Sequence, residues 1–89
     1  MSGNVQSIAE GGLFLNTTAT TTINGLGNLL GFMCNTASGG TVALVAGNGT
    51  ISPAVSVSAG QYYPYPGFFT GNLTVTIAGT ANITLFWVV

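Results

Sequence analysis

The side chains that could do chemistry in this chain are few, and they do not form a set. Glu10 is the single charged residue among 89, Cys34 is the single cysteine, and the sequence has no Lys, Arg, Asp or His. General acid–base catalysis needs a positioned titratable group, usually a histidine or a pair of carboxylates. A reactive thiolate needs a nearby base or positive charge. The sequence offers neither, so we expect no catalytic residue and no enzyme activity.

The same shortage argues against metals, cofactors and charged partners. Cys34 has no Cys or His at zinc-ligand spacing, and Glu10 lacks the acidic neighbours of a calcium loop. No Gly-Lys-Ser/Thr element is present to cradle a phosphate. Without Lys or Arg the chain cannot displace counterions from a nucleic acid or attach to an anionic membrane surface. We therefore expect no cofactor, no metal, no nucleic acid and no membrane partner. We interpret Cys34 as a buried thiol and Glu10 as a solvated residue.

The elements that carry these residues are predicted to be strands. Val, Ile, Thr, Phe and Tyr are abundant, the helix formers Glu, Lys, Arg and Gln are nearly missing, and Gly recurs too densely for a long helix. Strands are expected over residues 13–23, 29–35, 41–46, 54–58, 72–78 and 82–89, and residues 1–10 are expected to form an extended arm or an edge strand. Turns are expected at Asn24-Gly25, at 37–40, at 47–49 and at 79–81, the last of them closing a hairpin.

About seven short strands in one chain of this length predict a single all-β domain. We expect a small antiparallel β-sandwich of jelly-roll or Greek-key type over residues 13–89, with an N-terminal arm over residues 1–12. The sequence contains no apolar stretch long enough for a transmembrane helix. Its first residues lack the basic start and apolar run of a signal peptide. We therefore expect a product made in a cytoplasm.

A cluster of aromatic side chains is the most distinctive feature for binding. It comprises Tyr62, Tyr63, Tyr65, Phe68 and Phe69, in a segment that Pro64 and Pro66 exclude from the centre of a sheet and that we predict to be a loop. Three interpretations stay open: the rings cap the core, they contact another subunit, or they stack on a sugar. A sugar site would add carboxylates or amides around the rings, and carboxylates are missing. Val5 and Ile8 in the arm are further candidate interface residues.

The missing charges also make a prediction about assembly. Natural β proteins guard free sheet edges with Lys, Pro, bulges or covering segments. This chain has no Lys, and a net charge near zero removes the repulsion between copies. We expect its edges and apolar surface to be covered by copies of itself or by a larger scaffold. Such a contact would depend on shape, apolar burial and main-chain hydrogen bonds, and would be insensitive to salt.

Three motifs, in order, resemble small virion proteins of tailed bacteriophages. They are Cys34-Asn35-Thr36-Ala37-Ser38-Gly39-Gly40-Thr41, Gly60-Gln61-Tyr62-Tyr63-Pro64 and Thr76-Ile77-Ala78-Gly79-Thr80-Ala81, within a resemblance that covers residues 29–88. The resemblance implies a β-sandwich that decorates or cements a capsid, bound to the major capsid protein or another virion protein. It also implies a homo-oligomer, with a trimer favoured, located in the virion after assembly in the host cytoplasm. It carries no catalytic residue. The alternatives are a tail, fibre or spike component and a host-surface carbohydrate-binding module.

Overall fold

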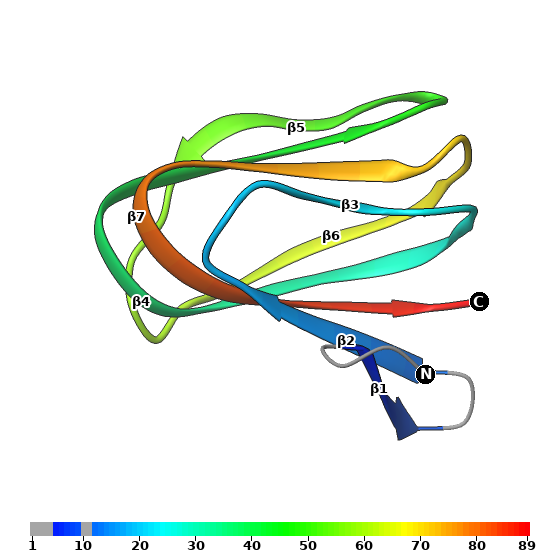
Figure 1. Ribbon diagram of the computed structural model, residues 1–89, viewed down its shortest axis with the longest axis horizontal. Coiled ribbons are helices and arrows are strands. Elements are labelled where there is room, and N and C mark those ends of the chain that lie inside the picture. Colours follow the sequence, from blue (N-terminus) through cyan, green and yellow to red (C-terminus); the bar gives the residue numbers. More distant parts are fainter. Residues whose placement is uncertain (1–4, 10–11) are drawn as a thin grey trace.

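The structure, a computed structural model, describes residues 5–9 and 12–89, with side chains from residue 12 onward. Its strands are β1 (Val5–Ala9), β2 (Gly12–Thr17), β3 (Thr21–Ile23), β4 (Gly27–Ala46), β5 (Gly49–Ser56), β6 (Tyr62–Phe69) and β7 (Leu73–Val88) (Figure 1). They form one antiparallel sheet with the path β1-β2-β7-β4-β5, to which β3 adds on β7 and β6 adds on β4. The predicted all-β class is confirmed. No helix in the described part of the chain is long and apolar enough to cross a membrane.

The long strands β4 and β7 run antiparallel over nearly their whole length. Their register begins with Asn28 opposite Val88 and ends with Ala46 opposite Leu73. Midway, both strands bend sharply (Figure 1). Gly39 and Gly79 lie at this bend with φ values of 67° and 73°, which glycine adopts without the strain that a side chain would add. The pairing there is shifted as in a β-bulge, because both Ser38 and Gly39 lie opposite Thr80.

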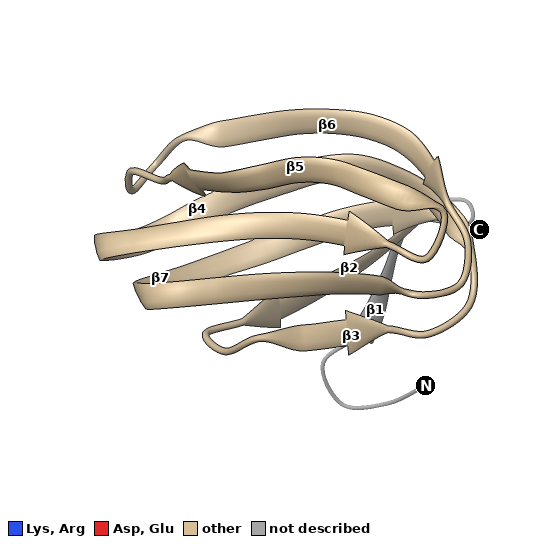
Figure 2. Cartoon of the chain, turned by 90° about the horizontal axis from the view of Figure 1, so that it is seen from above, with Lys and Arg blue, Asp and Glu red and all other residues tan. Residues whose placement is uncertain are grey.

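The bend divides the sheet into two layers that face each other (Figures 1 and 2). The first layer consists of β1, β2, the C-terminal half of β7, the N-terminal half of β4, and β6. The second layer consists of β3, the N-terminal half of β7, the C-terminal half of β4, and β5. Every strand except β4 and β7 therefore belongs to one layer only.

The core lies between the layers and draws on both. Its fully buried side chains are Leu29, Phe32, Cys34, Val42, Leu44, Phe69, Leu73, Val75, Ile83 and Leu85. Along the second half of β7 buried positions alternate with half-buried ones, the period of a strand that buries one face more deeply than the other. Among the described residues, no buried side-chain nitrogen or oxygen lacks a hydrogen-bond partner. The charge-poor sequence thus closes its core without an ion pair, and Figure 2 shows no charged residue on the described strands.

Several expected turns are wrong, and glycine explains the difference. The segments 37–40 and 79–81 were expected to end strands, but each lies inside a continuous strand, so the expected 72–89 hairpin is the single strand β7. The glycines bend these strands while the ladder continues on both sides. Asn24-Gly25 does not close a hairpin either, because β3 pairs with β7 and not with β4. The expected strand 13–23 is split into β2 and β3, which pair with different halves of β7.

The free edges of the sheet carry prolines and bulges in place of charges. The expectation that 61–67 forms a loop is wrong: β6 is a strand, and it pairs only with β4 in the described structure. Pro64 and Pro66 fit there because an edge strand leaves half of its N–H groups unpaired. Pro53 lies in β5, the corresponding edge of the second layer, beside a register shift. β3 has only three residues, and β1 has a register shift between Ser7 and Ala9.

Candidate functional site: the outer face of the first layer

Strand β6 divides the predicted aromatic cluster between the core and the surface. Tyr63, Tyr65 and Phe69 point inward. The Phe32 ring stacks on Tyr63 with centroids 5.0 Å apart and on Tyr65 at 5.9 Å, and Phe69 is fully buried. The Tyr63 hydroxyl accepts a hydrogen bond from the Ser58 backbone N–H at 2.9 Å. These three rings therefore pack on the core.

Tyr62 and Phe68 alternate with these residues and face outward. They are 44% and 54% exposed, and Tyr62 contacts Phe86 with ring centroids 6.4 Å apart. Within the predicted aromatic set, these two side chains are the exposed ones. Val5 and Ile8 lie in β1, but their side chains fall outside the described residues, as does Glu10.

Cross-strand neighbours extend this surface over the whole first layer. Phe14 on β2 lies opposite Phe86 on β7, and Leu30 on β4 stands at the bulge beside Phe86, 42% exposed. We call this surface the outer apolar face; its exposed and half-buried side chains are Phe14, Leu30, Met33, Tyr62, Phe68, Phe86 and Val88. Contiguous apolar surface that is exposed marks interaction sites in soluble proteins.

Sequence reasoning missed Phe14, Leu30, Met33, Phe86 and Val88. The signal was present in the runs Leu13-Phe14-Leu15 and Leu85-Phe86-Trp87, which are apolar on both faces of a strand. Such runs indicate burial on both sides, yet a two-layer fold covers only the inner side. The outer side is then left for a partner.

One end of this face carries a hydrogen-bonded polar group that we call the amide cluster; it comprises the amides of Asn16, Asn35 and Asn82 and the hydroxyl of Thr84. The Asn82 Oδ1 atom accepts from Asn16 Nδ2 at 2.9 Å and from Asn35 Nδ2 at 2.8 Å. The same two amides donate to the Thr84 hydroxyl at 3.1 and 2.9 Å. These bonds tie β2, β7 and β4 together on their solvent side. They also fix the orientation of the Asn82 side chain.

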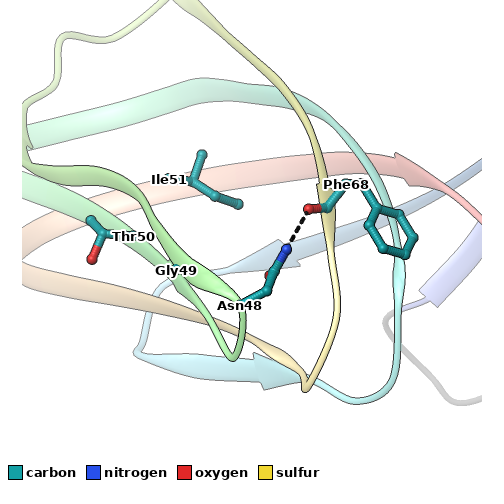
Figure 3. A pocket seen from close by; sticks show the side chains of 5 residues that line it. All are labelled: Asn48, Gly49, Thr50, Ile51 and Phe68. Atoms are coloured by element: carbon teal, nitrogen blue, oxygen red, sulfur yellow. Dashed lines mark hydrogen bonds between the residues drawn. The ribbon is translucent and has the colours of Figure 1, made fainter.

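Asparagines also fix the turns at the end of the molecule where β6 finishes. Asn48 Nδ2 donates to the Phe68 carbonyl and its Oδ1 accepts from the Thr70 N–H, both at 3.1 Å. An open cavity of about 140 Å³ lies beside it, lined by Asn48, Gly49, Thr50, Ile51 and Phe68 (Figure 3). Its lining has no titratable side chain, and its amide is already bonded to the backbone. The cavity therefore offers no chemistry.

Cys34 is buried, as expected, between the two layers. Its Sγ lies 3.5 Å from the Thr36 carbonyl oxygen, to which it donates. Burial raises the pKa of the Cys34 thiol above its ordinary value, because the interior disfavours the thiolate. No group of three metal-ligating side chains occurs in the described chain. The thiol is thus neutral at physiological pH and shielded from reagents.

This burial predicts how stability depends on alkaline pH. A thiol whose folded pKa is raised favours folding while it is protonated in both states. That contribution falls as pH rises above the unfolded pKa of about 8.5 and continues to fall toward the folded pKa. We expect the free energy of unfolding, measured by urea denaturation, to decline as the pH rises above about 8.5. The Cys34→Ala variant should lose this decline; an unchanged slope would contradict the prediction.

Comparisons of the chain with protein-family models, with curated proteins and with solved structures found no match. No relative therefore assigns a function to the outer apolar face.

Proposed function

We propose that this chain is a structural subunit of a bacteriophage virion, a cement or decoration protein that stabilises the capsid by non-covalent, uncharged contacts. The proposal extends to the finer architecture: a small β-sandwich of jelly-roll type whose N-terminal segment, residues 1–12, contacts the major capsid protein or another virion protein. The two facing layers and the edge position of β1 support it. The motif resemblance in residues 31–42, 59–66 and 73–86 supplies the setting.

The observation that carries the proposal is an apolar, charge-free face on a sheet with guarded edges. Phe86, Leu30 and Phe68 present apolar surface on a chain without any positive charge. Such a surface has nothing to offer nucleic acid or a charged substrate. It can adhere through apolar burial and hydrogen bonds, as protein interface cores do. A subunit that resists the internal pressure of a packaged particle needs adhesion of this kind.

The carbohydrate-binding alternative draws on the amide cluster. Asn82 and Thr84 lie on the same face as the Tyr62 and Phe86 rings, which gives amides near aromatic groups. The residue that tests this alternative is Tyr62, because Tyr63 faces the core. Glycan-array binding by the wild type that is lost in Tyr62→Ala would favour it over the capsid proposal.

The test of the proposal uses particles and purified protein. We expect mass spectrometry to find the chain in purified virions and cryo-EM to place it on the outer shell. Protein added back to stripped particles should bind with an affinity that changes less than about twofold between 0.1 and 1 M NaCl, since exposed charge pairs alone are screened over this range. Deleting residues 2–10 should lower occupancy. Absence of the chain from all particles, or its release at high salt, would refute the proposal.

A further inference from the structure

We propose that the outer apolar face binds a second copy of this chain, face to face, about a two-fold axis that runs along β7. This deepens the proposed function, on which it rests for its setting on a particle: the face joins two subunits to each other, and residues 1–12 contact the shell. Four features indicate that a second copy covers this face: the edge strands are interrupted by prolines and bulges, the face has no charge, it carries the amide cluster, and its area suits a dimer.

The edges are poor sites for association, which leaves the face. β6 presents Pro64 and Pro66, β5 presents Pro53, β3 is three residues long and β1 carries a register shift. Prolines and bulges interrupt the row of N–H and C=O groups that strand addition requires. A copy added at an edge would therefore find an incomplete ladder. The uncovered apolar surface of the first layer has no such obstacle.

The face is compatible with itself. Two identical charged surfaces repel each other when they meet, but no charged side chain lies on the described strands. Sheets that pack face to face align within about 30° and lie about 10 Å apart. With an axis along β7, Phe86 of each copy lies near the axis and Leu30 of one copy faces Phe14 of the other. This contact is isologous, so it forms pairs and not the trimer that the resemblance favoured.

The same arrangement provides hydrogen-bond partners for the polar side chains at the end of the face. The hydrogen bonds within the amide cluster use the Nδ2 groups of Asn16 and Asn35 and the Oδ1 of Asn82. Within the described part of the chain, Asn82 Nδ2 donates no hydrogen bond, and the Oδ1 atoms of Asn16 and Asn35 accept none. An axis along β7 places one amide cluster over the other. The amide donors of one copy can then hydrogen-bond to the amide acceptors of the other copy, directly or through bridging water.

The area of the face suits a dimer. The first layer has five strands side by side, in the order β1, β2, β7, β4 and β6. With strands about 4.8 Å apart and about six residues at 3.3 Å each, one face covers about 480 Å², so a pair buries about 1,000 Å². That value reaches the lower bound for a specific protein interface, about 1,000 Å². A partner much smaller than a second sheet would leave part of the face uncovered.

A pair of matched variants on β4 tests this inference in purified protein without particles. Leu30 and Val45 are each 42% exposed on β4, Leu30 in the first layer and Val45 in the second. We expect sedimentation equilibrium to show a dimer for wild type and Val45→Lys. Leu30→Lys should dissociate, with a Kd raised at least about 100-fold, because each ammonium group would be buried without a partner charge against Phe14 of the other copy. A wild-type monomer or trimer, or a Leu30→Lys dimer of unchanged affinity, would overturn the proposal.

Cross-linking gives a second readout that does not depend on the charged variant folding well. Thr84 and Thr76 are both on β7, on the outer surfaces of the first and second layers respectively. A short bis-maleimide should link Thr84→Cys into covalent dimers and leave Thr76→Cys monomeric, with buried Cys34 giving no background. Equal linking of both variants would contradict the axis along β7. If Thr84→Cys forms no covalent dimer but the protein still binds particles, the proposed interface is refuted and the proposed capsid role is not.

Discussion

Replacing Phe69 with alanine will lower the free energy of unfolding by about 3–5 kcal/mol, the range for a fully buried phenylalanine. Phe69 has no exposed surface, and it lies where β6 packs against β4 and the Trp87 side of the core. The substitution removes its apolar contacts and leaves a cavity that the stiff strands around it cannot close. A domain of this length has about 4–13 kcal/mol of total stability. The variant should therefore be close to unfolding at room temperature.

The neighbouring Phe68→Ala variant is the matched control. Phe68 is the same residue type, adjacent in the strand and 54% exposed, and the bond that Asn48 makes to it uses its backbone carbonyl. Its substitution should change stability by less than about 1 kcal/mol. Urea denaturation of both variants at one protein concentration measures the difference. Equal losses would contradict the inward and outward assignment of these two rings.

Gly40→Ala should be nearly as damaging, for a steric reason. Gly40 lies at the bend where β4 is paired with β7, and a Cβ built there would come 2.5 Å from the Thr80 carbonyl oxygen and 2.8 Å from the Ala81 Cβ. Neither atom can move aside, because one is backbone and the other belongs to the opposite strand of the bend. Forcing them apart should cost about 2–4 kcal/mol, at or above the usual range for overpacking.

Gly67→Ala is the control for this prediction. Gly67 also lies within a strand, but a Cβ there would have no heavy atom within 4 Å, and its φ is not in the left-handed region. Alanine at this position should be neutral within about 0.5 kcal/mol or slightly stabilising, since it reduces the freedom of the unfolded chain. Thermal denaturation of both variants tests the pair. A Gly40→Ala variant as stable as wild type would show that β4 and β7 pack less closely at the bend than described.

The all-β class could be predicted from the sequence because it depends on residue types that act locally. The alternation of Val, Thr and Ile over residues 72–78 indicates a strand wherever that strand lies in the fold. What could not be predicted was which glycines end a strand and which bend one. Gly47 lies in a true turn between β4 and β5, whereas Gly79 lies inside β7. The two are distinguished by the neighbouring strand, since a continuous partner such as β4 holds the ladder together through the bend.

The exposure of the candidate contact residues could be predicted only in part, for a similar reason. Tyr62 and Phe68 were identified as surface aromatics, but Tyr63, Tyr65 and Phe69 were grouped with them because the segment was interpreted as a loop. Prolines exclude a central strand, yet they are compatible with an edge strand, where alternate residues face opposite sides. The outer apolar face then depends on the register between β2, β7, β4 and β6. Register between distant segments is not visible in local patterns.

The shared strands β4 and β7 have a consequence for how the chain folds. Each layer includes one half of β7, so neither layer is complete until residues 73–88 have been synthesised and have paired with β4. Pairing between segments so far apart in sequence is slow, because the entropy of closing the connecting chain is lost before the contacts form. During that delay the growing chain exposes uncharged strands to other copies. Rapid completion of β7 therefore competes with misassembly, and slower synthesis just before residue 73 should favour aggregates.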